Sequence, residues 1–119
     1  MKTNKRTIGK IHEEMAAEYL KKNGFKILAM NYRNRFGEID IVAQEGKYLI
    51  FSEVKYRRSS SAGNPLYAVD RRKQKQISYT AMHYLRENKI LDNIPIRFDV
   101  VSLMPNEIKL IRNAFDFSL

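Results

Sequence analysis

Acidic side chains alternate with apolar ones in two neighbouring segments of this chain, at the spacing of a β-strand. Glu38 and Asp40 lie in the segment 37–43, and Glu53 and Lys55 lie in the segment 48–55. Because the side chains of a strand alternate between its faces, each pair points to a single face. If the two segments pair as a hairpin, three carboxylates and one ammonium converge. Carboxylates beside an apolar core are unstable unless a cation, such as a divalent metal ion, neutralises them.

This pattern predicts a metal site that hydrolyses phosphodiester bonds. Asp40 and Glu53 are the expected direct ligands, and the backbone carbonyl of Val54 is a candidate third ligand. Glu38 points to the same side as Asp40, one residue pair further along. A Mg²⁺ (or Mn²⁺) ion held by carboxylates polarises a phosphate and lowers the pKa of its bound water. Lys55 is placed to orient the attacking water or to stabilise the negative charge that develops.

The same alternation is also typical of a solvated sheet face, on which Lys55 simply pairs with one of the acids. Two features favour the metal site. The second segment is apolar on both faces up to Phe51, as in a central strand, and its charges come only at its C-terminal end. The three acids also lie together in a chain whose net charge is +9.

The rest of the sequence predicts the elements that position this hairpin. Its periodicity and turn residues indicate a helix over 9–23, a strand over 25–32, a loop over 56–65, a helix over 70–88 and strands over 96–103 and 107–111. In the first helix the apolar residues at helical spacing, expected to be buried, are Ile11, Met15, Ala16, Ala17, Tyr19 and Leu20. The order of these elements predicts an α/β fold with a central mixed sheet flanked by helices.

Composition narrows the class of protein. The 119 residues suffice for one domain, 1–119, and 44% of them are hydrophobic, which argues against disorder. Without cysteine and with two histidines, the chain favours an oxygen-ligated metal. We expect no membrane association, because no apolar run approaches the roughly 20 residues of a membrane helix. The N-terminus carries no secretory signal, so a cytoplasmic location is expected.

Basic residues flank the acidic hairpin and predict a nucleic-acid partner. One group surrounds the hairpin, and the other occupies the first turns of the second helix, where cations oppose the helix dipole unless an anion docks there. The two groups are Arg33, Arg35, Lys55, Arg57 and Arg58, and Arg71, Arg72, Lys73 and Lys75. The alternative is a solvated basic surface. The sequence favours DNA over RNA only through the resemblance below, and it leaves a homodimer open.

The motifs resemble the small bacterial YraN family and, more widely, the restriction-endonuclease-like PD-(D/E)xK nucleases. The matching residues are Gly9 and Glu13, Asn31-Tyr32-Arg33, Phe36-Gly37-Glu38-Ile39-Asp40, Glu53-Val54-Lys55, Lys73-Gln74 and Arg97-Phe98-Asp99-Val100. The resemblance implies an αβββαβ core similar to that of Holliday-junction resolvases, with Asp40, Glu53 and Lys55 as catalytic residues. It also implies that Glu13, from the first helix, joins the metal site and that Gln74 belongs to the nucleic-acid-binding surface.

Together these observations predict a Mg²⁺-dependent endonuclease that acts on structured or branched DNA in repair or recombination. Thr80 stands where some exonuclease relatives carry a tyrosine four residues after Gln76, which argues against an exonuclease. The alternative is a non-catalytic nucleic-acid-binding module on a nuclease-like fold. A third hypothesis is an interaction domain whose basic face binds an acidic protein. We expect Asp99 to be a buried structural acid.

Overall fold

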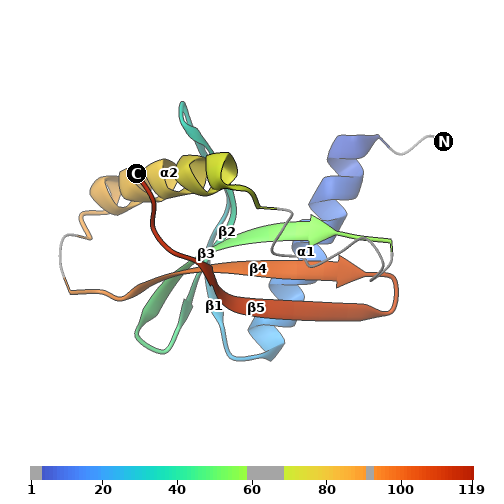
Figure 1. Ribbon diagram of the computed structural model, residues 1–119. Coiled ribbons are helices and arrows are strands. Elements are labelled where there is room, and N and C mark those ends of the chain that lie inside the picture. The colour runs from blue at the N-terminus through green and yellow to red at the C-terminus, as the bar shows by residue number, and fades with distance from the viewer. Residues whose placement is uncertain (1–3, 59–68, 91–92) are drawn as a thin grey trace.

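The computed structural model describes residues 4–58, 69–90 and 93–119. Within these ranges, two helices and five strands follow one another in the expected order, and Figure 1 shows their arrangement. They are α1 (Lys5–Lys22), β1 (Lys26–Asn34), β2 (Gly37–Glu45), β3 (Tyr48–Tyr56), α2 (Arg71–Glu87), β4 (Ile96–Met104) and β5 (Glu107–Phe115). Residues 59–65 of the expected loop lie outside the described part of the chain.

The strands form one mixed sheet in the order β1-β2-β3-β4-β5. The pairs β1–β2, β2–β3 and β4–β5 are antiparallel, whereas β3 and β4 run parallel on either side of the connection that contains α2. The central strand is therefore β3, as its apolar run predicted. The predicted α/β fold with a mixed sheet and the αβββαβ order are confirmed.

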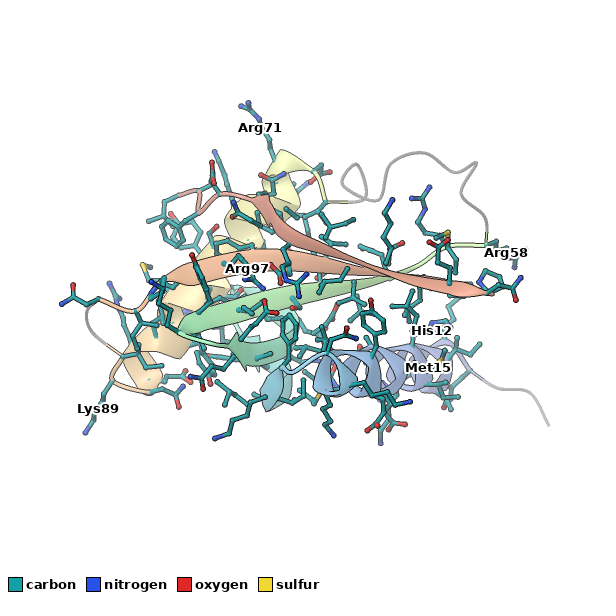
Figure 2. All side chains as sticks on the ribbon, turned by 90° about the horizontal axis from the view of Figure 1, so that it is seen from below. His12, Met15, Arg58, Arg71, Lys89 and Arg97 are labelled. Carbon is teal, nitrogen blue, oxygen red and sulfur yellow. The ribbon has the colours of Figure 1, made fainter. Side chains whose placement is uncertain are left out.

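The two helices cover opposite faces of the sheet, so the sheet lies between two apolar cores (Figure 2). The core under α1 contains Leu20 and Ile41, and the core under α2 contains Phe51 and Ile77. Neither of the two described helices is long and apolar enough to cross a membrane.

The buried side of α1 differs from the one that the sequence predicted. Ala16, Ala17 and Leu20 are buried as expected, but Ile11 and Met15 are 48% and 46% exposed. The small alanine side chains let the helix lie close to the sheet, and this contact turns Ile11 and Met15 toward solvent. The helix also begins earlier than position 9, because the Asn4 side chain caps it by accepting the N–H of Thr7.

The boundaries of α2 agree with the prediction. The Asp70 side chain caps its first turn by accepting the N–H of Lys73, and Asn88 ends it. Strand β5 continues to Phe115, beyond the expected end at 111. Apolar side chains continue the strand, since Phe115 stacks on Phe98 with ring centroids 5.1 Å apart.

A buried ion network joins β4 to β2 and β5 on the face covered by α1. Arg97 donates two hydrogen bonds to Asp99, at 2.8 and 2.9 Å, and one to Glu45 at 2.6 Å. Arg112 donates two more to Glu45, and the backbone N–H of Asn113 donates to Asp99. Asp99 is fully buried and bound on both sides, so it is the structural acid that the sequence predicted.

Candidate metal centre and nucleic-acid surface

The candidate site lies where β2 separates from β3. The pairing of the two strands runs from Glu45↔Tyr48 to Ile41↔Ser52, whereas β3 stays paired with β4 as far as Tyr56. Beyond Ile41 the backbone of β3 is therefore no longer matched by that of β2. The Asp40 carboxylate takes this place and accepts the N–H of Val54 at 2.8 Å. The fork between the strands thus fixes Asp40 against the centre of the sheet.

Two further carboxylates lie close to that of Asp40. Glu38 comes from the same strand, and Glu13 comes from α1. One carboxylate oxygen from each of Glu13, Glu38 and Asp40 lies within 4.8 Å of the others. Oxygen donors at this spacing, without nitrogen or sulfur ligands, suit Mg²⁺ or Mn²⁺. The donor set therefore fits the metal that the sequence predicted.

Glu53 stands beside this group rather than within it. Its side chain is only 8% exposed, and one oxygen lies 3.3 Å from Lys55 Nζ and 3.9 Å from Lys73 Nζ. Lys55 follows on the same strand, whereas Lys73 comes from the first turn of α2. The predicted contact of Lys55 with the acids is present. Lys73, predicted for nucleic-acid binding, also reaches the acids.

Two of the four acids, Asp40 and Glu13, have raised pKa values. Burial, followed by the nearby charge of Glu53, raises the pKa of Asp40 to about 8, although the hydrogen bond from Val54 opposes the shift. Burial also raises the pKa of Glu13, and Glu38 and Glu53 add to this effect. Near neutral pH such a group holds a proton that a divalent cation can displace. Perturbed carboxylates of this kind are typical of functional sites.

The sequence-predicted residues thus fall into three positions. Glu13, Glu38 and Asp40 form the close group, Glu53 and Lys55 adjoin it, and the N–H of Val54 is engaged by Asp40. The predicted use of the Val54 carbonyl as a ligand stays a prediction.

The cations around the hairpin have different surroundings. Arg33 lies 3.3 Å from Glu38, and Arg35 stacks over the ring of Phe36 at 4.9 Å. Phe36 in turn stacks on His83 of α2, with ring centroids 4.4 Å apart, which docks the turn between β1 and β2 on that helix. Arg57 is half-buried and Arg58 exposed, just after β3.

The cations of α2 surround a separate hollow of about 640 Å³ at the start of this helix. It is lined by Arg71, Arg72, Gln74, Lys75 and the C-terminal residues 116–118. The Gln74 amide donates to the carbonyl of Val69 at 2.9 Å, so this side chain also anchors the segment that leads into α2. Figure 2 shows Arg71 extending away from the body of the molecule.

Sequence reasoning did not assign three residues that lie at the acids. Asn31 lines a hollow together with Glu13 and Glu38 and has a left-handed backbone with φ 54, a conformation that asparagine tolerates better than most residues. A polar residue within an otherwise apolar strand was the sequence feature that could have pointed to it. Arg6 and Lys10 of α1 line a hollow beside Glu13 and Glu38. Arg6 was missed because the helix was expected to begin at position 9, whereas Lys10 lay inside the expected helix but was given no role.

Comparison with known proteins identifies a family. The sequence profile described as "Uncharacterised protein family UPF0102" matches residues 12–103. A UPF0102 protein of Lachnoclostridium phytofermentans is 50% identical over 113 residues, which cover 95% of this chain and 96% of that protein. A UPF0102 protein of Syntrophus aciditrophicus is 49% identical over 122 residues, which cover 99% and 94%.

Among solved structures, the crystal structure of SSO0001 superposes with a TM-score of 0.47 and 18% identity over 91% of this chain and 51% of that chain. The sequence matches confirm the resemblance to the YraN family that the motifs indicated. This chain belongs to the UPF0102 (YraN) family.

Proposed function

We propose that the protein is a Mg²⁺- or Mn²⁺-dependent nuclease that hydrolyses phosphodiester bonds. The observation that carries the proposal is the group of Glu13, Glu38 and Asp40, whose carboxylate oxygens lie within 4.8 Å of one another beside Glu53 and Lys55. Three acids at this spacing repel one another unless a cation or protons neutralise them. Because the pKa of Asp40 is raised to about 8, the group holds a proton near neutral pH, and a divalent cation can take the place of that proton.

Each residue has a defined task in this proposal. Asp40, Glu13 and Glu38 would hold the metal, with Glu53 as a candidate fourth ligand beside them. A bound Mg²⁺ would polarise the phosphate and supply a water of lowered pKa. Lys55 stabilises the negative charge that develops on the phosphate or orients the water, and Glu53 holds the Lys55 ammonium in place at 3.3 Å.

The basic surface supports a nucleic acid as substrate. Arg71, Arg72 and Lys75 leave the start of α2 positively charged, while Lys73 links that helix to Glu53. Phosphates of a bound strand would gain from these side chains and from the amides at the helix start. A preference for structured or branched DNA, and a role in repair or recombination, rests on the resemblance to Holliday-junction resolvases.

The direct test is cleavage of labelled branched, flapped and linear DNA in Mg²⁺ or Mn²⁺. We expect cleavage of a branched or flapped DNA by the natural protein, its loss in EDTA, and a loss of at least about a hundredfold in Asp40→Asn. Asp40→Asn keeps an acceptor for the N–H of Val54 and removes only the charge. Cleavage that persists in Asp40→Asn would show that another protein or another site is responsible.

The non-catalytic alternative predicts a different result in the same experiment. A binding module would bind the DNA without divalent ions, with equal affinity in Glu53→Gln, and would leave every substrate intact. That result would contradict the nuclease proposal while keeping the nucleic-acid partner.

A further inference from the structure

A hollow of about 520 Å³ opens directly beside the acid group. Helix α1 lines it with Arg6, Gly9, Lys10 and Glu13, and strands β1 and β2 line it with Asn31, Arg33 and Glu38. The volume lies within the range of small-ligand sites, roughly 300–1,000 Å³. The hollow therefore has room for a charged group of a substrate whose neighbouring group reaches the acids.

Arg6 and Lys10 are placed where their charges destabilise the helix. They lie four residues apart, so they neighbour each other on the surface of α1, and the first turn of this helix contains no acid. Cations near a helix N-terminus also oppose the helix dipole. Among the residues that the structure describes, neither side chain forms an ion pair. An anion in the hollow would offset both the repulsion between the two cations and their unfavourable interaction with the helix dipole.

Gly9 lets the hollow extend to the backbone of α1. It lies between the two cations in sequence and lines the hollow, and a Cβ atom built on it meets no other atom within 4 Å. Glycine within a helix is less favourable than alanine or glutamine. A larger residue here would therefore stabilise the helix and at the same time fill the hollow. Such a variant separates a loss of binding in the hollow from a loss of helix stability.

We propose that this hollow binds one phosphate of the nucleic-acid strand next to the phosphate that is cleaved, with Arg6 and Lys10 as positioning residues. The inference deepens the proposed function and rests on it. Since α1 and α2 cover opposite faces of the sheet, the strand is held by α1 on one side of the acids and by the cations of α2 on the other. A strand held on both sides is cleaved internally, as by an endonuclease.

The competing explanation is that Arg6 and Lys10 only neutralise Glu13 and Glu38. Their removal would then strengthen Mn²⁺ binding by the acids and would leave each phosphate contact of the DNA unchanged. Under our proposal their removal abolishes the contribution of one particular phosphate.

The test is a double-mutant cycle between the protein and the DNA backbone. A labelled branched DNA carries one uncharged methylphosphonate, moved one linkage at a time, and its binding to the full chain is measured by fluorescence anisotropy in EDTA. We expect one linkage at which the methylphosphonate weakens DNA binding by the natural protein about tenfold. The same methylphosphonate should not change DNA binding by Arg6→Gln/Lys10→Gln. For this variant the slope of log affinity against log salt concentration should be smaller in magnitude by about 0.9.

Two further variants keep the test independent of folding and of overall charge. Lys21→Gln/Lys22→Gln removes the same charge from the other end of α1 and should retain the full effect of the sensitive linkage. Gly9→Gln removes no charge, should unfold no more easily than the natural protein, and should lose the effect of that linkage.

The outcomes separate this inference from the proposed function. The inference is overturned if the methylphosphonate effect is lost equally in the two double variants, or if it persists in Arg6→Gln/Lys10→Gln. Either result leaves the nuclease proposal intact. If the methylphosphonate effect disappears in Arg6→Gln/Lys10→Gln but the natural protein cleaves no DNA, the phosphate site is supported and the nuclease proposal is contradicted. Absence of any nucleic-acid binding contradicts both.

Discussion

Asp40 combines burial with the charges of three neighbouring acids. Its carboxylate accepts the N–H of Val54, and Glu13 and Glu38 each place an oxygen within 4.8 Å of the group. Burial and Glu53 are the two largest causes that raise its pKa to about 8. Without metal, this one residue therefore makes the stability of the protein depend on pH.

In EDTA, Asp40→Asn should stabilise the protein at alkaline pH. The folded state keeps the Asp40 proton up to about pH 8, whereas the unfolded chain releases it near its ordinary value of 3.8. The natural protein therefore loses stability as pH rises between these values, and the variant is spared this loss. We expect a gain on the order of a few kcal/mol at pH 8 and almost none at pH 4.

Urea denaturation of both proteins at the two pH values measures this difference. Added Mg²⁺ should stabilise the natural protein at pH 8 but not Asp40→Asn, because the metal takes the place of the proton. A difference between the proteins that is the same at both pH values would show that Asp40 is not the titrating group.

Asp99 shows how a buried acid behaves when its charge is satisfied within the protein. Asp99→Ala would leave the Arg97 guanidinium with one carboxylate partner and the N–H of Asn113 with none. We expect the free energy of unfolding to fall by about 3–5 kcal/mol. Arg112→Gln, at the half-exposed end of the same network, should change it by less than about 1 kcal/mol. Urea denaturation measures the free energy of unfolding of both variants. Equal losses in the two would contradict the claim that the buried part of the network contributes most of its stability.

Strands β2 and β3 could be predicted because alternation and the polar turn expected over 44–47 mark them. The same is true of α2, where Asp70 and Asn88 mark both ends. The fork could not be predicted, because it depends on β3 continuing with β4 after β2 has separated from it. Glu13 could be assigned only from the family resemblance, since no local pattern shows which neighbour a boundary side chain reaches.

The face of α1 was predicted wrongly for a related reason. Ile11 and Met15 repeat at helical spacing as well as Ala16 and Leu20 do, so periodicity alone favours the larger side chains. The distance between helix and sheet decides instead, and the alanines allow the closer contact.

Gly37 tests how the β1–β2 turn is held against α2. A Cβ atom at this position would lie 2.7 Å from Cγ of Gln76 and 3.1 Å from Oγ1 of Thr80. Gly37→Ala should therefore destabilise the protein by about 1–3 kcal/mol, measured by urea denaturation. Adding Gln76→Ala should recover part of this loss. Strictly additive effects of the two substitutions would contradict the close contact.

The whole molecule carries a net charge of +9, yet several of its acids gather at the fork and in the network around Arg97. A surface that is basic around an acidic centre attracts a polyanion and leaves the centre for a metal. Figure 2 shows Arg71 and Lys89 at opposite ends of α2, so charge can be removed from either end of this helix.

DNA affinity should fall steeply with salt, with a slope of about −0.9 for each phosphate neutralised. We expect Arg71→Gln/Arg72→Gln to reduce this slope by about 1–2, because these cations belong to the same first turn of α2 as Lys73, which reaches Glu53. Arg86→Gln/Lys89→Gln removes the same charge from the far end of α2 and should change the slope much less. Titrations between 50 and 200 mM salt measure it, and equal slopes in the two variants would argue for non-specific attraction.

The most direct measurement is the anomalous scattering of a crystal of this protein soaked in Mn²⁺ at pH 8. We predict one strong peak at about 2.1 Å from carboxylate oxygens of Asp40 and of at least one of Glu13, Glu38 and Glu53. The same soak of Asp40→Asn crystals should give no peak. A natural protein that binds no Mn²⁺ at the fork, while its acids keep the arrangement described above, would contradict the metal centre and with it the nuclease.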